Sequence, residues 1–172
     1  GFNLIKCQLN VLLNNTANHN FEWGIHGGHS NYSAIINCTV NNNLGDGILT
    51  DHCQGNIILS NTAFNNQVMG ISVSGYFLNV SENEITGSIE NGLFIQSNDS
   101  LFNDNTIKNN LGNGISLMHS FNNSFSRNSV INNSFSGMSI SESHNNKFKN
   151  NIINENMEHG MSFTFSNNNT II

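Results

Sequence analysis

A glycine that recurs at a nearly constant interval constrains this chain more than any other feature of its sequence. The interval is about 23 residues and varies by only one residue along the chain. Each glycine opens a short motif of glycine, apolar, variable and usually apolar residues, as in Gly137-Met138-Ser139-Ile140. A period this regular predicts a stack of identical supersecondary units. The eight glycines are Gly1, Gly24, Gly47, Gly70, Gly92, Gly114, Gly137 and Gly160.

Three short apolar strips recur in every repeat. In the repeat that starts at Gly114, Ile115 and Leu117 alternate with Ser116 and Met118, which is typical of a strand with one buried face. The pattern predicts an all-β coil of about seven and a half turns, each with three short strands. The inward residues of the second strip are Leu12, Ile35, Ile58, Val80, Phe102, Phe125, Phe148 and Ile171, and those of the third are Ala17, Val40, Ala63, Ile85, Ile107, Val130 and Ile153.

Asparagine is unusually abundant, with 38 of 172 residues, and much of it falls in two columns. Identical amides stacked about 4.8 Å apart bond to one another and to turn backbone, which satisfies polar groups at buried corners. We therefore predict asparagine ladders. One column runs through Asn15, Cys38, Asn61, Asn83, Asn105, Asn128 and Asn151, and the other through Asn20, Asn43, Asn66, Ser88, Asn110, Asn133 and Asn156.

The full repeat, G-Φ-x-Φ…Φ-x-x-N-x-Φ…N-N-x-x-x-G with Φ apolar, resembles the right-handed parallel β-helix repeats of the NosD-like and carbohydrate-binding/sugar-hydrolase group. The resemblance covers essentially the whole chain. It implies a right-handed parallel β-helix, and it leaves the activity open because that group includes binding modules, adhesins, lyases, epimerases and periplasmic accessory proteins. A leucine-rich repeat is the competing fold, since Phe125–Val130 matches half of its motif.

Residues 1–172 are expected to form a single β-helix domain. The chain opens in register and stops at Ile172 within the eighth repeat, without visible polar caps, so we expect it to be part of a longer solenoid. A net charge of −6 with five basic residues argues against nucleic-acid binding. No apolar run approaches the ~20 residues that span a bilayer.

The repeats at 70–91 and 92–113 are one residue short. The apolar alternation predicts that this residue is missing between the first and second strands, a variable corner of the kind that carries function. In the second of these repeats, Phe94 and Gln96 point outward. We predict that they contact glycans, because an aromatic ring stacks on a sugar while an amide bonds its hydroxyls.

Histidines cluster in the second and third repeats. His29 and His52 share one column, and His26 and Asp51 lie near the same corner. Imidazole and carboxylate are suitable ligands for zinc, copper or nickel, so these four residues are candidate metal ligands. No other cofactor is expected. The alternative interpretation is a plain stack of like residues, and the resemblance to NosD suggests copper only by association.

Glu82, Asp104 and Arg127 fall in one outward column and are the candidate catalytic residues. Paired carboxylates beside an arginine suit acid/base chemistry and neutralisation of substrate charge. The alternative is an exposed Asp104–Arg127 pair, which contributes little to stability.

A third surface is apolar. The outward positions of the second strand in the first three repeats form a contiguous patch of the kind that marks an interface. We predict that it mediates self-association or lies under a covering segment. The six residues are Val11, Leu13, Ala34, Ile36, Ile57 and Leu59.

These observations favour a non-catalytic extracellular, cell-surface or periplasmic module that binds polysaccharides, other glycans or partner subunits. A carbohydrate-active enzyme, such as a polysaccharide lyase, epimerase or hydrolase, is the first alternative. A structural spacer or assembly subunit is the second. The single arginine among the candidate catalytic residues weighs against the enzyme.

Overall fold

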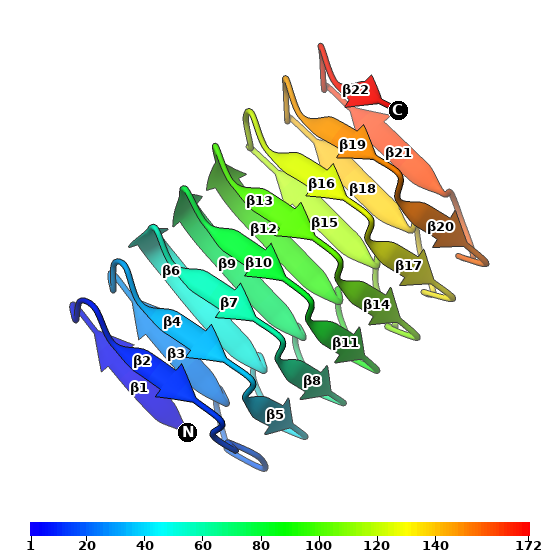
Figure 1. Ribbon diagram of the computed structural model, residues 1–172. Coiled ribbons are helices and arrows are strands. Elements are labelled where there is room, and N and C mark those ends of the chain that lie inside the picture. Colours follow the sequence, from blue (N-terminus) through cyan, green and yellow to red (C-terminus); the bar gives the residue numbers. More distant parts are fainter.

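The computed structural model describes residues 1–172 and contains 22 β-strands and no helix. It therefore has no helix that could span a membrane. All strand pairs are parallel, and the turns stack along one axis (Figure 1). The predicted parallel β-helix with three strands per turn is confirmed, and the leucine-rich repeat is wrong because no helical segment exists.

Three parallel sheets run the length of the coil. Sheet 1 contains β1 (Phe2–Ile5), β3 (Ile25–Gly28), β6 (Ile48–Gln54), β9 (Ile71–Tyr76), β12 (Leu93–Asn98), β15 (Ile115–Met118), β18 (Met138–Ser141) and β21 (Met161–Thr164). Sheet 2 contains β2 (Val11–Leu13), β4 (Ala34–Ile36), β7 (Ile57–Leu59), β10 (Asn79–Ser81), β13 (Leu101–Asn103), β16 (Ser124–Ser126), β19 (Lys147–Lys149) and β22 (Thr170–Ile171). Sheet 3 contains β5 (Thr39–Asn41), β8 (Thr62–Phe64), β11 (Glu84–Thr86), β14 (Thr106–Lys108), β17 (Ser129–Ile131) and β20 (Ile152–Asn154).

The core is a column of apolar side chains contributed by all three sheets. Ile115, Leu117, Phe125 and Val130 are buried, as the alternation predicts. Phe125 stacks between Phe102 and Phe148, with ring centroids 4.8 and 4.9 Å apart. These distances equal the spacing of hydrogen-bonded strands, so the backbone ladder itself holds the rings at stacking distance.

The predicted asparagine ladders are present, and their inner members are buried. Asn83 donates from its backbone N–H and its side-chain amide to Oδ1 of Asn105, both at 3.0 Å, and its amide also reaches the carbonyl of Ile58 at 2.9 Å. Each inner amide therefore makes hydrogen bonds to both neighbouring turns and to the backbone of its own corner, which satisfies the buried polar groups there. At Cys38 the chain of amides is interrupted, and the thiol donates weakly to backbone carbonyls instead.

Close packing explains the glycine period. A Cβ on Gly137 would lie 2.3 Å from Cγ2 of Ile153, 2.7 Å from Nδ2 of Asn156 and 2.7 Å from the carbonyl oxygen of Gly160 in the next turn. Gly92 is enclosed in the same way by a core side chain, a ladder amide and the next turn's glycine carbonyl. Neither glycine has a positive φ, so the requirement is space and not backbone conformation.

The corner between sheets 1 and 2 differs between turns. Six turns place one residue there in the left-handed conformation, with φ between 47° and 53°. The turns that begin at Gly70 and Gly92 lack this residue, and β9 and β12 run straight through the corner. The predicted position of the missing residue is therefore confirmed. The six left-handed residues are Lys6, His29, His52, His119, Glu142 and Phe165.

Gly75 closes the first of the shortened corners. Its φ is 141°, and a Cβ there would lie 1.8 Å from the carbonyl oxygen of Cys53. The register between β6 and β9 shifts between Thr50 and Cys53, which is where the longer turn accommodates its extra residue. Only glycine permits this close approach.

Candidate functional site

The corner between sheets 1 and 2 carries two adjoining hollows, which together we call the corner groove. The first, the notch, has a volume of about 320 Å³ and is lined by His52, Ser74, Gly75, Tyr76, Gln96, Asn98 and His119. The second, the cleft, has a volume of about 520 Å³ and is lined by His119, Phe121, Glu142, His144 and Phe165. Because His119 lines both, the two hollows adjoin at its imidazole and together extend from the third turn to the eighth.

The notch presents uncharged hydrogen-bonding groups. The amide of Gln96 and the hydroxyl of Tyr76 make no hydrogen bond within the protein, and Tyr76 is 54% exposed. Asn98 accepts a 2.8 Å bond from the backbone N–H of Phe121 through Oδ1, which leaves its NH₂ group available. No carboxylate lines this hollow. An aromatic ring among neutral donors and acceptors suits sugar hydroxyls.

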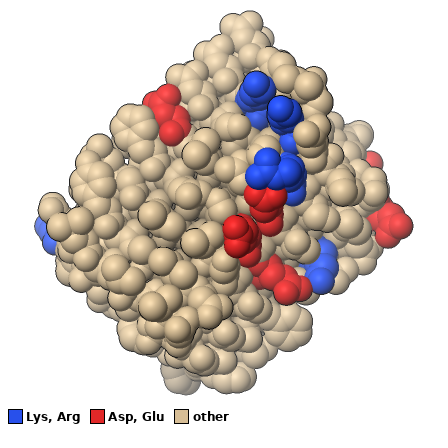
Figure 2. Space-filling model, viewed as in Figure 1, with Lys and Arg blue, Asp and Glu red and all other residues tan.

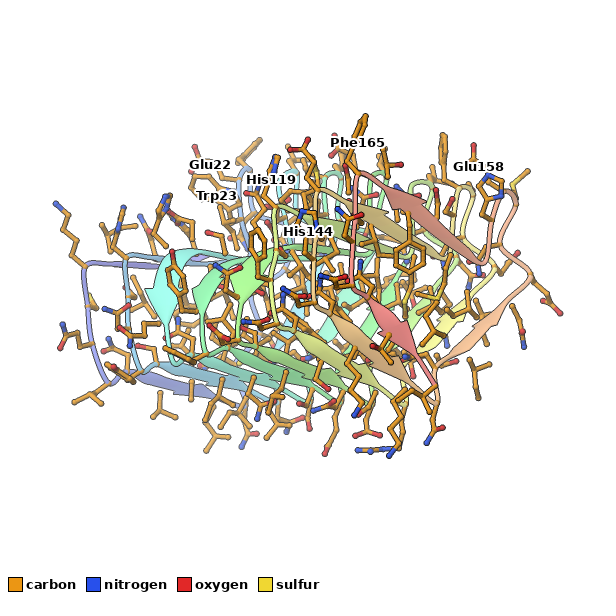
Figure 3. The ribbon with its side chains drawn as sticks, turned by 90° about the horizontal axis from the view of Figure 1, so that it is seen from above. Glu22, Trp23, His119, His144, Glu158 and Phe165 are labelled. Atoms are coloured by element: carbon orange, nitrogen blue, oxygen red, sulfur yellow. The ribbon has the colours of Figure 1, made fainter.

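The cleft adds two phenyl rings and two imidazoles. Nδ1 of His144 accepts a 3.0 Å bond from the backbone N–H of Asn167, so a neutral His144 carries its proton on Nε2 and offers that as a donor. Its ring stacks on Phe121 with centroids 5.3 Å apart. His119, His144 and Phe165 project from neighbouring turns on one side of the coil (Figure 3), and Phe165 is 81% exposed.

The histidine cluster adjoins the N-terminal end of the notch. His29 and His52 stack with centroids 4.9 Å apart, as their shared column predicts. Asp51 lies 2.9 Å from Nε2 of His26 through one oxygen and 3.1 Å from Nδ1 of His52 through the other. Partial burial opposes its charge, but the hydrogen bonds from the two histidines prevail and lower the pKa of Asp51.

Gly28 makes room for this arrangement. A Cβ there would lie 3.0 Å from Oδ1 of Asp51 and 3.2 Å from Nε2 of His26. His26 is held from its other side by Trp23, with ring centroids 4.5 Å apart. The neighbouring Cys53 is buried, donates its thiol to the carbonyl of Gly27, and has a pKa raised by that burial.

The two residues predicted to contact glycans, Phe94 and Gln96, lie in different places. Gln96 enters the notch, whereas the half-buried Phe94 pairs with Ser72 and Ser116 on the outer face of sheet 1 and lines neither hollow. The aromatic side chain beside Gln96 is Tyr76, which sequence reasoning missed. The one-residue shortening was the signal that could have found it, since it brings both residues to the same corner.

The candidate catalytic residues lie elsewhere, at the corner between sheets 2 and 3. Arg127 donates from Nε and Nη2 to the two oxygens of Asp104, at 2.8 and 2.6 Å, and this pairing lowers the pKa of Asp104. Glu82 accepts a 3.0 Å bond from Ser60. All three are exposed, and none lines a hollow. Charged side chains form a line across this face (Figure 2).

The predicted apolar patch faces outward on β2, β4 and β7. Val11, Leu13 and Ile57 are 64%, 53% and 39% exposed, and the register places the three strands side by side. The surface over β2 and β4 is free of charged side chains (Figure 2). The remaining members, Ala34, Ile36 and Leu59, are half-buried.

Comparison with known protein families shows which family this chain belongs to. One family profile, described as periplasmic copper-binding protein (NosD), matches residues 1–135 and 79–172, and the two matches overlap to cover the whole chain. The chain belongs to the NosD family. A comparison with curated proteins found no match.

Solved structures share the fold of this NosD-family chain. The periplasmic alginate epimerase AlgG is 17% identical with a TM-score of 0.73, over 96% of this chain and 46% of its own. The A-module of the Azotobacter vinelandii mannuronan C-5 epimerase AlgE6 is 13% identical with a TM-score of 0.85, over 96% and 57%. Pectate lyase Pel9A is 13% identical with a TM-score of 0.61, over 91% and 50%. The chain spans about half the length of these proteins, and the likeness concerns the fold.

The NosD description raises the question of copper, and three of the four predicted ligands come together. Donor atoms of His29, Asp51 and His52 all lie within 4.8 Å of one another. His26 instead braces Asp51, and its Nδ1 is buried without a partner. Imidazole and carboxylate donors suit copper. The two rings are stacked with centroids 4.9 Å apart, and Nδ1 of His52 already contacts Asp51, so a shared ion would require these side chains to rearrange.

Proposed function

We propose that this NosD-family domain binds a polysaccharide chain along the corner groove and does not transform it. The observation that carries the proposal is that the notch and the cleft adjoin at His119, so that aromatic rings and hydrogen-bonding groups recur over successive turns. A linear sugar chain repeats along its length and can therefore contact groups that recur along the coil. The family description and the name of AlgG both specify the periplasm, and we place the domain outside the cytoplasm accordingly.

The geometry supports a chain that lies parallel to the coil axis. Successive turns are about 4.8 Å apart, which is comparable to the length of one pyranose unit. Phe165 is 81% exposed and offers its ring, whereas Phe121, two turns away, is stacked against His144 on one face. The Nε2–H of His144 and the carboxylate of Glu142 offer a donor and an acceptor between them. A ring face bordered by hydrogen-bonding groups fits the apolar face and the hydroxyls of a sugar.

The enzyme alternative receives some support from the neighbours, since their names specify alginate epimerase, mannuronan epimerase and pectate lyase. Binding is favoured because Glu82, Asp104 and Arg127 border no cavity, and Arg127 already neutralises Asp104. A substrate bound in the groove would lie across sheet 2 from these residues.

Affinity electrophoresis in gels that contain dissolved polysaccharides, neutral and acidic, tests the proposal. Phe165→Ala removes a stacking platform worth about 0.5–1.5 kcal/mol and should weaken binding by about two- to tenfold. Phe135→Ala is the matched control, because Phe135 is 48% exposed but lies outside the groove. Absence of retardation in every polysaccharide, or equal loss in the two variants, contradicts groove binding. New unsaturated or reducing ends that vanish with Glu82→Gln and Asp104→Asn would favour the enzyme.

Copper binding is a second candidate function, favoured by the proximity of His29, Asp51 and His52 and by the family description. The imidazoles of His29 and His52 would hold the ion, with Asp51 as a third ligand or as the hydrogen-bond acceptor that orients His52. Bound copper would add a positive charge beside the notch. Isothermal titration with copper(II) sulfate should show one site that His29→Ala or His52→Ala removes and that His159→Ala, an exposed control, retains. Equal heats in the three variants would eliminate this site.

A further inference from the structure

We propose that the notch is a subsite for one uncharged sugar unit, formed by the loss of one corner residue from each of two adjacent turns. This inference rests on the proposed binding of polysaccharide in the corner groove. According to this inference, the notch alone selects neutral sugars over acidic ones.

The cavity exists because the corner column is interrupted. His52 and His119 occupy that column on either side, and both adopt the left-handed conformation. The intervening turns pass from Ser74 directly to Gly75 and from Gln96 directly to Ser97, which pair with each other in continuous strands. The missing side chains leave a gap two turns long between two imidazole walls. Its volume of about 320 Å³ suits a small ligand.

The floor of the notch is rigid before any ligand arrives. β9 and β12 pair over six consecutive residues, from Leu93 opposite Ile71 to Asn98 opposite Tyr76. Ser74 accepts a 2.9 Å bond from the backbone N–H of His52 and so ties the floor to the wall. A site built on paired strands loses little conformational freedom on binding.

The charges around the notch select against acidic sugars. The lining includes no lysine, arginine or carboxylate. His52 contacts Asp51 at 3.1 Å and His119 contacts Glu142 at 3.4 Å, so any positive charge on either imidazole is already paired. A uronate carboxylate would find no free cation here and would be repelled by Asp51 and Glu142. Gln96, Tyr76 and the NH₂ of Asn98 instead offer neutral partners for hydroxyls.

Restoring the missing residues tests this assignment. One asparagine inserted after Ser74 and one after Gln96 would return both turns to the length of their neighbours and fill the notch, since asparagine tolerates the left-handed corner. The native chain and this variant are compared on an array of mannohexaose, cellohexaose, xylohexaose, hexagalacturonate and hexamannuronate. The tightest neutral probe is then titrated. We expect the native chain to prefer a neutral hexasaccharide by at least tenfold, and the insertions to weaken that binding at least tenfold.

Point variants keep the test decisive if the insertions disturb folding. Gln96→Ala and Tyr76→Ala should each weaken the neutral probe several-fold, whereas Tyr32→Ala, which removes an equally exposed tyrosine outside the groove, should not. Circular dichroism confirms that each variant is folded. Unchanged affinity in both notch variants, or native preference for a uronate probe, overturns the inference while groove binding stands. Native failure to bind any probe, neutral or acidic, defeats the proposed function itself.

Discussion

Removing one amide from the centre of the first ladder should destabilise the whole coil. Asn105 is fully buried, and its Oδ1 accepts from the backbone N–H and the amide of Asn83, both at 3.0 Å. Its own amide donates to the carbonyl of Val80 at 2.9 Å and to Oδ1 of Asn128 at 3.0 Å. Asn105→Ala therefore removes four hydrogen bonds and leaves the N–H of Asn83 buried without an acceptor.

The expected loss follows from these contacts. An orphaned buried donor costs about 1–3 kcal/mol, and each of the three remaining bonds contributes about 0.5–1.5 kcal/mol net, so we expect a loss of about 5 kcal/mol in the free energy of unfolding. That is a large part of the ~5–15 kcal/mol that stabilises a typical domain. In urea, with a slope of about 2–3 kcal/mol per molar, the midpoint should fall by about 2 M.

Urea titration followed by far-ultraviolet circular dichroism measures this shift. Asn154→Ala is the matched control, because Asn154 is exposed on β20 and its side chain makes no hydrogen bond; it should change the free energy of unfolding by less than about 0.5 kcal/mol. Fluorescence of Trp23, the single tryptophan, reports whether the N-terminal turns unfold with the rest. Equal midpoints for the two variants would falsify the claim that the ladder is a principal source of stability.

Three further changes follow from the same reasoning. Cys38→Asn should complete the ladder between Asn15 and Asn61 and raise the free energy of unfolding by about 1 kcal/mol, measured by urea titration; a decrease would show that the thiol is needed for packing. Burial raises the pKa of Asp46, so its charge destabilises the fold at pH values above that raised pKa, and the penalty disappears as the pH falls below the ordinary value of 3.8. Asp46→Asn, which keeps an acceptor for the N–H of Met69, should therefore raise the melting temperature at pH 7 and have no such effect in strong acid; a stability gain that is independent of pH would refute this account. If the apolar patch mediates self-association, Leu13→Asp and Ile36→Asp should shift sedimentation toward the monomer, while Leu101→Asp, on the same sheet outside the patch, should not.

The sequence predicts the core well because the period transfers every assignment from one turn to the next. Once Ile115 and Leu117 are placed inward, the parallel register fixes their counterparts in every turn. The position of the shortened corner follows for the same reason, because only one placement keeps both strands in phase. The apolar positions predicted to face inward are mostly buried in the structure, so most of the fold could be predicted from them.

The site was harder to predict because it depends on side-chain directions at one irregular corner. Tyr76 and His144 escaped notice because the column that they share with Asn98 and Phe121 has a different residue type in each of these turns. His26 was grouped with the metal candidates, but a 2.9 Å contact turns its ring toward Asp51. Spacing along the sequence brings residues to the same corner but does not fix which atoms meet.

The glycine and amide contact also bears on how such a chain changes over generations. This contact recurs in most turns, so an exchange between two such turns removes or adds whole turns and joins similar ends. Genetic duplication or loss of a segment one turn long thus alters the length of the groove without creating a new junction. If the groove binds a polysaccharide as proposed, the length of chain that it accommodates would change in single-turn steps, while the core and both ladders stay intact.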